Sequence, residues 1–290
     1  MKVKSAQNKI GDWGFVIICF LVSVICVLPM LNLLAKSLSS GEYLVRNDVF
    51  LLPKGLNFEA YIQVFKNSKY VWSFVWTVIL TIVCTLVSLA MTTVCAFPLI
   101  FDKLKGRGII NVYITVTMFF SAGAIPNYLL MKSLGLLNNP LVMILPGCLS
   151  VYNMIIMRSF FYGIPDSLRE SAEIDGATFF QILLKIYVPL SKPVMATLAL
   201  FYAVGRWNGY GDALMYVKDE KFYPLQLYLF NIMNNVNKME VETLEGISTP
   251  GLAASMKAAV VMFSTIPILC IYPWLQRFFI QGVTLGAVKE

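Results

Sequence analysis

The chain has 290 residues, of which 58% are hydrophobic and 13% are charged, and its mean hydropathy is +0.72. Soluble domains average about 45–50% apolar and about 25% charged residues, so this chain has too few polar side chains to cover a water-soluble globule. The composition therefore predicts an all-α integral membrane protein with a single domain over residues 1–290. The net charge of +7 does not indicate a nucleic-acid partner, because the basic residues lie in short loops beside apolar runs.

Six apolar runs are long enough to cross a bilayer as helices, since a hydrocarbon core of about 30 Å requires about 20 residues. Five of these runs contain no Asp, Glu, Lys or Arg, and the other contains Arg206 and Asp212. The first run is longer than the apolar core of a secretory signal, so we expect it to be a retained span. The six predicted transmembrane helices cover residues 13–35, 72–101, 109–131, 140–157, 193–217 and 258–276.

The basic residues predict how these helices are oriented. Lys and Arg are concentrated before residue 13, in the loops 102–108 and 158–192, and after residue 276, and the positive-inside rule places such segments in the cytoplasm. Both termini are thus predicted to be cytoplasmic in a multi-pass protein of a bacterial plasma membrane, surrounded by lipid. The outward loops are 36–71, which also carries several basic residues, 132–139, and 218–257. The last loop holds five acids: Asp219, Glu220, Glu240, Glu242 and Glu245.

Residue types that carry covalent chemistry are scarce. The chain has no His, and its six Cys lie inside apolar runs without CxxC spacing, so neither a metal site nor a disulfide framework is expected. No G-x-x-x-x-G-K-[S/T] motif occurs, so we expect no cofactor in this chain, and either a separate chain supplies the energy or the protein is not ATP-driven. An enzyme is not indicated. A secondary carrier or channel for a small polar solute is the alternative, although proton coupling usually requires intramembrane carboxylates or His.

A polar segment, residues 162–189, separates the fourth and fifth runs on the predicted cytoplasmic side. Ser167 and Glu170 have the spacing of a capping box, and Gly176 follows as a helix-stop and turn signal. Residues 177–188 can then resume as an amphipathic helix. The pattern predicts a helix, a glycine turn and a second helix that together offer a compact knob to another protein, and a plain reverse turn between two spans is the alternative.

The stretch E-S-A-E-I-D-G-A, beginning at Glu170, and the stretch I-Y-V-P-L-S-K-P, ending at Pro193, are similar to the cytoplasmic EAA loop of permease subunits of bacterial ATP-binding-cassette importers. That family's pattern is Glu-Ala-Ala, a Gly four residues after the second Ala, and a later hydrophobic-Pro pair. Ser171 replaces the first Ala. Other stretches, such as AIPNYLLMKSLGLLNNPLVMILPG and FYPLQLYL, resemble the carbohydrate branch, of the maltose-type second permease, over essentially the whole chain.

The resemblance implies a permease that forms the translocation pathway of a sugar or oligosaccharide importer by alternating access. It implies three kinds of protein partner, namely a second permease, two ATP-binding subunits and an extracellular solute-binding protein. It also implies an oligosaccharide substrate, with ATP and Mg²⁺ bound by the ATP-binding subunits. The loop would act as a coupling helix that docks on an ATP-binding subunit. Carried over by position, the docking residues are Glu170, Ser171, Ala172, Asp175, Gly176 and Ala177.

The fifth run carries side chains suited to a substrate path. A charge within the membrane usually faces protein or a water-filled cavity, aromatic planes stack on the C–H faces of sugars, and an Arg also suits an anionic sugar. On a continuous helix, Tyr202, Arg206 and Tyr210 would share one face. The predicted pathway residues are Tyr202, Arg206, Trp207, Asn208, Tyr210 and Asp212. In the alternative interpretation, Arg206 pairs with Asp212 or extends outward, and the aromatic residues form an interfacial belt.

Overall fold

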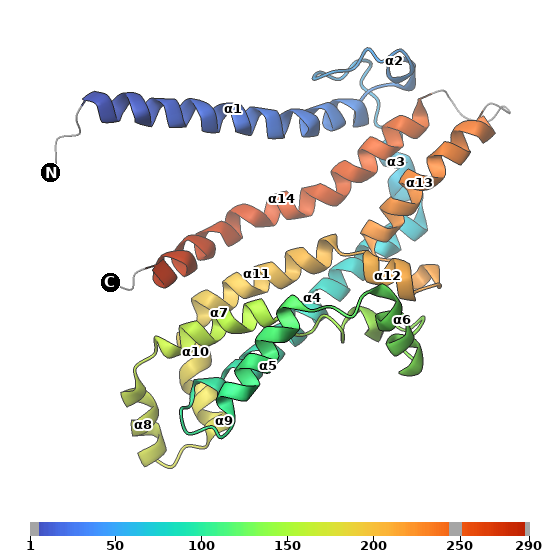
Figure 1. Ribbon diagram of the computed structural model, residues 1–290. Coiled ribbons are helices and arrows are strands. Elements are labelled where there is room, and N and C mark those ends of the chain that lie inside the picture. The colour runs from blue at the N-terminus through green and yellow to red at the C-terminus, as the bar shows by residue number, and fades with distance from the viewer. Residues whose placement is uncertain (1–5, 244–250, 288–290) are drawn as a thin grey trace. The chain divides into compact units, whose positions relative to one another are not determined.

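A computed structural model describes residues 6–243 and 251–287 of the chain, and these contain helices and no β-strand (Figure 1). The all-helical prediction is thus confirmed for the described ranges. The chain divides into two compact units, Met1–Val71 with Leu229–Ile266, and Trp72–Tyr228 with Pro267–Glu290. The predicted orientation relies partly on four residues that lie outside the described ranges: Lys2, Lys4, Glu245 and Lys289.

The first unit is built on long apolar helices. Its aromatic residues Phe65 and Tyr70 both pack on Phe263, with ring centroids 4.9 Å and 5.5 Å apart. Side chains such as Phe15 are largely exposed along α1, which is expected where lipid covers the surface. The unit comprises α1 (Ala6–Ser37), α2 (Gly41–Val45), α3 (Glu59–Lys66), the start of α4 (Ser68–Ala96), most of α13 (Leu225–Thr243) and the first part of α14 (Leu252–Ala287).

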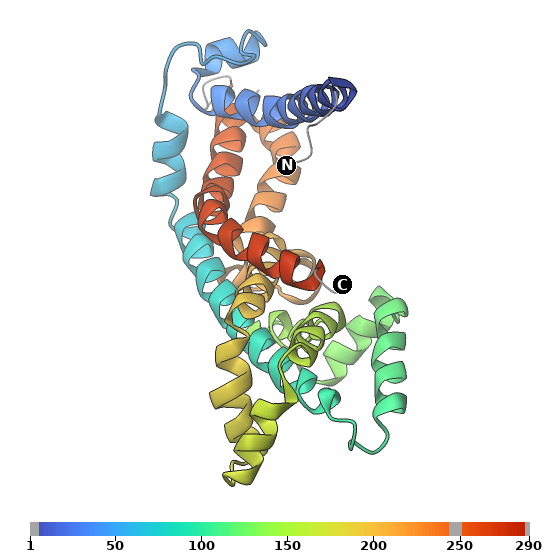
Figure 2. The same cartoon turned by 90° about the vertical axis from the view of Figure 1, so that its left-hand side faces the viewer.

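The second unit holds most of the short and broken helices. Figures 1 and 2 show α8 and α9 together at one end of this unit. After α4 its elements are η1 (Pro98–Ile100), α5 (Arg107–Phe119), α6 (Ala124–Ser133), η2 (Pro140–Met143), α7 (Val151–Tyr162), α8 (Asp166–Ile174), α9 (Phe179–Ile182), the π-helical turn η3 (Leu183–Tyr187), α10 (Val188–Leu190), α11 (Lys192–Asn208), α12 (Gly211–Tyr216) and η4 (Glu220–Phe222).

An aromatic core holds the second unit together near its α8 end. Phe97, Phe161 and Tyr187 are almost completely buried. Tyr187 meets Phe97 and Phe161 edge to face, with centroid distances of 5.1 Å and 5.3 Å. Such pairs contribute about 0.5–1.5 kcal/mol each beyond their buried area, so this cluster fixes α4, α7 and η3 to one another.

The predicted continuous span at 109–131 is wrong. The structure has two helices there, α5 and α6, bent by 115° at a four-residue break. Gly123 lies in this break with a φ of +89°, a conformation that side-chain-bearing residues rarely adopt, and its N–H donates to the Ser121 hydroxyl. The chain therefore turns at a position that hydropathy alone reads as apolar and helical.

The predicted span at 140–157 is also wrong as a continuous helix. Only the short η2 and the first half of α7 are helical, and the residues between them are irregular. Asn139 caps η2 by accepting from the N–H of Leu141, and Ser150 caps α7 by accepting from the N–H of Asn153. Two separate capped helices begin within the apolar run, which places irregular backbone between them.

The fifth predicted span, 193–217, is interrupted. α11 ends at Asn208, Gly209 adopts an extended conformation and α12 begins at Gly211. A side chain at position 209 would approach the carbonyl oxygen of Gly205 to 3.1 Å. The polar residues of this run therefore lie on two helices, and Tyr202 and Tyr210 do not share one helical face as predicted.

These breaks also change how many spans length and composition support. Among the described residues, Trp13–Ser37 and Ser68–Ile100 are long and apolar enough to cross a membrane. Two bent pairs, α5 with α6 and Phe179–Leu190 with α11, raise the count to four if each pair is one span. The residues of the sixth predicted run, 258–276, are helical within α14.

Candidate substrate cavity and coupling segment

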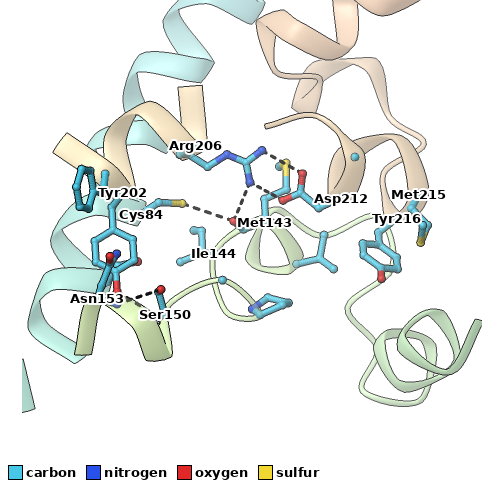
Figure 3. Close-up of a pocket in the computed structure, with 17 residues that line it drawn as sticks. Cys84, Met143, Ile144, Ser150, Asn153, Tyr202, Arg206, Asp212, Met215 and Tyr216 are labelled. Atoms are coloured by element: carbon cyan, nitrogen blue, oxygen red, sulfur yellow. Dashed lines mark hydrogen bonds and ion pairs between the residues drawn. The ribbon is translucent and has the colours of Figure 1, made fainter. Parts of the chain in front are cut away.

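A cavity of about 620 Å³ lies within the second unit (Figure 3). Its wall comes from α4, η2, the irregular segment before α7, α7 itself, α11 and α12, so two of the three broken runs, 140–157 and 193–217, supply most of it. The lining residues are Cys84, Ser88, Val142, Met143, Ile144, Pro146, Gly147, Ser150, Asn153, Phe201, Tyr202, Gly205, Arg206, Gly211, Asp212, Met215 and Tyr216.

Arg206 forms the polar centre of one side of the cavity. Its guanidinium pairs with both carboxylate oxygens of Asp212, with Nη2 3.0 Å from Oδ1, and donates to the carbonyl oxygens of Met143 and Gly209 at 3.2 Å and 2.8 Å. Its side chain is 10% exposed and that of Asp212 is 29% exposed. Arg206 thus joins α11, α12 and the segment before α7, and Figure 3 shows its contacts with Asp212 and Met143 converging on one guanidinium.

This geometry matches the alternative interpretation, in which Arg206 pairs with Asp212, and it also places both side chains on the cavity wall. The pair is neutral overall, so the cavity presents an ion pair to its interior and not a free positive charge. The orientation of the pair is set by two carbonyl oxygens, one of them 63 residues away in sequence.

Tyr202 forms the polar centre of the opposite side. Its hydroxyl is 2.7 Å from the Thr92 hydroxyl on α4 and accepts from the N–H of Ser150 at 3.2 Å. That N–H belongs to the residue that caps α7, which has few other partners available at a helix start. Tyr202 therefore ties α11 to α4 and to the N-terminus of α7.

Removing only this hydroxyl should destabilise the protein measurably. We expect Tyr202→Phe to lower the free energy of unfolding by about 1–2 kcal/mol, because the Ser150 N–H loses its acceptor inside the protein. Thermal unfolding of the detergent-purified chain measures the change. Tyr152→Phe on α7 is the matched control, since the Tyr152 side chain is 56% exposed. Equal melting temperatures for the two variants would contradict a structural role for the Tyr202 hydroxyl.

Of the six predicted pathway residues, the structure brings Tyr202, Arg206 and Asp212 to the cavity, and the other three lie elsewhere. Trp207 is buried and meets Phe74 edge to face at 5.9 Å. Asn208 is exposed and its side chain donates to the carbonyl oxygen of Val204. Tyr210 occupies the break between α11 and α12.

Several cavity residues lie outside the predicted pathway set. Ser150, Asn153 and Tyr216 add hydrogen-bonding groups to the wall, and Pro146 with Gly147 shapes the irregular segment. A sequence signal exists for the irregular segment, because a Pro-Gly pair inside an apolar run indicates an interrupted helix. The prediction of one helix over 140–157 did not take this signal into account.

The polar segment 162–189 folds as a helix, a glycine turn and a second helix, as predicted. α8 ends in a Schellman motif: the N–H of Ala177 donates to the carbonyl of Ala172 at 2.9 Å, and that of Gly176 to Glu173 at 3.1 Å. Gly176 has a φ of +78°, which explains why glycine occupies the turn.

The predicted capping box at Ser167 and Glu170 is wrong. Pro165 precedes α8 without a side-chain cap, and the reciprocal box forms one helix later, where Thr178 and Gln181 bond each other's backbone N–H groups. Ser171 instead donates to the carbonyl oxygen of Ser167 within α8. A Thr-x-x-Gln pattern directly after the glycine turn was the stronger signal.

The six predicted docking residues divide into two groups. Glu170, Ser171, Asp175 and Gly176 are exposed, whereas Ala172 and Ala177 are partly buried against the aromatic core. Ile174, which lies outside the predicted set, is 87% exposed at the end of α8. The outer surface of α8 is therefore acidic with two exposed apolar side chains, Leu168 and the protruding Ile174.

Arg169 organises the acids of α8. Its guanidinium lies 3.1 Å from Asp166 and 3.2 Å from Glu173, while its side chain is only 19% exposed. Partial burial acts to lower the pKa of Arg169, but the hydrogen bond to Asp166 and the charges of Glu173 and Asp166 outweigh it and raise the pKa above its ordinary value. The side chain therefore stays charged and holds both carboxylates on one face.

Known proteins are similar to this chain over almost its full length. Two proteins of Bacillus subtilis (strain 168) match it: "Protein LplC" is 38% identical, covering 92% of this chain and 91% of that protein, and "Polygalacturonan/rhamnogalacturonan transport system permease protein YtcP" is 37% identical, covering 98% and 99%. A chain in the crystal structure of a bacterial ABC transporter involved in the import of the acidic polysaccharide alginate is 31% identical, with a TM-score of 0.88 over 96% of this chain and 100% of that one.

Residues 73–285 match the model of a protein family described as binding-protein-dependent transport system inner membrane component. This match covers most of the chain and includes the cavity and the coupling segment. The resemblance seen in the sequence is confirmed, and the chain is a membrane transport component and not an enzyme. It belongs to the family of inner membrane permease components of binding-protein-dependent ABC transport systems.

Proposed function

We propose that this chain forms one half of the translocation pathway of an ATP-driven importer for acidic oligosaccharides. A related second permease supplies the other half, two ATP-binding subunits supply the energy, and an extracellular solute-binding protein delivers the substrate. ATP and Mg²⁺ are bound by the ATP-binding subunits, with no cofactor in this chain. The chain crosses a bacterial plasma membrane six times, counting broken helices as spans, with both termini in the cytoplasm.

The observation that carries the ATP-driven mechanism is the geometry of α8. A short helix that exposes Glu170, Asp175 and Ile174 and ends in a tight glycine turn presents a compact acidic surface. Charge complementarity favours a basic cleft on the ATP-binding subunit, and the apolar tip adds buried area on docking. The loops 102–108 and 158–192 carry many basic residues, which supports the cytoplasmic location of this surface.

The proposed substrate class rests on the relatives and on the cavity. The 37%-identical relative is named for polygalacturonan and rhamnogalacturonan, and polygalacturonan consists of units that carry carboxylates. The 31%-identical chain belongs to an importer of an acidic polysaccharide. In this chain, Ser150, Asn153, Tyr202 and Tyr216 offer hydroxyl and amide groups to sugar hydroxyls. The Arg206–Asp212 pair keeps the cavity free of net negative charge, so a substrate carboxylate is not repelled.

Uptake by the reconstituted importer tests this function. The chain, its second permease, the ATP-binding subunits and the binding protein are incorporated in vesicles with ATP inside. We expect ATP-dependent accumulation of oligogalacturonate to exceed that of a neutral maltooligosaccharide of equal length by at least about tenfold, a difference of about 1.4 kcal/mol. Uptake without ATP would indicate a secondary carrier. Equal uptake of both sugars would overturn the acidic substrate class and leave the importer assignment intact.

A further inference from the structure

Phe101 lies where α4 and η1 give way to the loop before α5, and three side chains surround its ring. The guanidinium carbon of Arg169 lies 5.4 Å from the ring centroid. The ring of Phe179 meets it edge to face at 5.4 Å, and the ring of Phe97 at 5.0 Å. Phe101 is partly buried and packs against the aromatic core.

These contacts join both sides of the glycine turn to one ring. Arg169 belongs to α8, before Gly176, and Phe179 is the first residue of α9, after it. The turn at Gly176 is closed by two backbone hydrogen bonds, and a Cβ at this position would meet no atom within 4 Å. The contacts at Phe101 add side-chain packing to both sides of the turn, and a cation above a ring and an edge-to-face aromatic pair both have preferred geometries.

A continuous series of contacts leads from Phe101 into the unit. Phe97, one helical turn earlier, meets Tyr187 at 5.1 Å and Phe161 at 6.4 Å. Displacement of α8 therefore acts through Phe101 on the buried residues that fix α4, α7 and η3 to one another. Chains of packed side chains are one means by which a docking surface can be coupled to a distant helix.

We propose that Phe101 is a positioning residue for energy coupling: it holds α8, through Arg169, at a fixed place on the permease, so that movement of a docked subunit reaches α4 instead of only bending the loop. This inference rests on the proposed function of α8 as the docking surface. In this role Phe101 does not touch substrate or nucleotide.

The test uses the complete reconstituted importer and two measurements, sugar uptake per ATP hydrolysed and hydrogen–deuterium exchange of the Asp166–Ile174 amides. We expect Phe101→Leu, which keeps an apolar side chain but removes the ring, to increase exchange about two- to fivefold, the factor expected for loss of a cation–π contact. Uptake per ATP should fall by a similar factor. Phe101→Tyr keeps an aromatic ring, so amide exchange and uptake per ATP should both stay close to their wild-type values. Phe120→Leu is the matched control, because Phe120 is 78% exposed.

A second variant, Arg169→Met, removes the same cation–ring contact from the side of α8. It provides the test of the inference if the importer with Phe101→Leu does not assemble. The effect of the double variant Phe101→Leu/Arg169→Met should be smaller than the sum of the two single effects, because both variants lose the same cation–ring contact while each also loses contacts of its own. Unchanged uptake per ATP in Phe101→Leu, or equal impairment of Phe101→Tyr, would overturn the inference.

The same data separate this inference from the proposed function. If the ATP-binding subunits do not slow exchange in Asp166–Ile174 of the wild-type chain, the docking role of α8 fails, and this inference fails with it. If they slow exchange in the wild-type chain and Phe101→Leu transports with unchanged uptake per ATP, docking stands and only the role of Phe101 is rejected.

Discussion

The double variant Glu170→Arg/Gly176→Leu is expected to abolish uptake while the protein still inserts and folds. The Glu170 side chain is 65% exposed, and its only ion-pair contact among the described residues is 3.9 Å from Arg169, so reversing its charge costs the permease itself little. A side chain at position 176 meets no atom within 4 Å, although the backbone φ of +78° strains any residue other than glycine.

The damage is therefore expected at the interface with the ATP-binding subunit. If docking at this surface contributes about 2 kcal/mol, uptake should fall by about 30-fold or more. The measurements are ATP-dependent uptake and the melting temperature of the purified permease. Lys105→Glu reverses an exposed charge in the loop between η1 and α5 and serves as the control. Normal uptake by the double variant would remove α8 from the docking site.

The second large effect is expected at Arg206. Arg206→Ala leaves the Asp212 carboxylate and the carbonyl oxygens of Met143 and Gly209 without their shared donor. Removing one partner of a largely buried pair costs about 3 kcal/mol, so we expect a clear loss of melting temperature as well as uptake. Uptake of every tested oligosaccharide at the wild-type rate would contradict the assignment of this cavity to the substrate path.

A paired variant separates folding from transport at this site. Arg206→Met/Asp212→Leu replaces both charges with apolar side chains, and such replacements of buried pairs are often neutral for stability. We expect part of the loss of melting temperature seen in Arg206→Ala to be recovered, because no unpaired Asp212 charge remains, although the carbonyl oxygens of Met143 and Gly209 still lack a donor. Uptake should stay impaired, because the cavity loses its ion pair. Recovery of both properties would show that the pair serves only to hold α11, α12 and the segment before α7 together.

The structure places Arg206 both in an ion pair with Asp212 and on the wall of the cavity. The pairing explains how an arginine is tolerated within an apolar run, since four hydrogen bonds satisfy its charge and both terminal nitrogens. Its neutrality also means that the pair itself adds no net positive charge to the cavity.

Composition and local pattern determined the class of protein and the conformation of the coupling segment. Apolar content sufficient for membrane insertion is a property of the chain itself, independent of packing. The turn at Gly176 is equally local, because a left-handed residue that closes a Schellman motif involves only Ala172 to Ala177. The capping box is a local feature too. It forms between Thr178 and Gln181, and not between Ser167 and Glu170, which have the same spacing.

Tertiary structure decided how the broken apolar runs are stabilised. Hydropathy measures how apolar a segment is, but not its direction, so 109–131, 140–157 and 193–217 read as straight helices, although Pro146 and Gly147 signal one of the breaks. In the run 140–157, partners far away in sequence satisfy the backbone: Arg206 donates to the carbonyl of Met143, and the Tyr202 hydroxyl accepts from the N–H of Ser150. Non-helical backbone within a membrane protein is stable only when other segments supply its hydrogen bonds. The cavity therefore forms only when the folded chain brings these distant residues into contact.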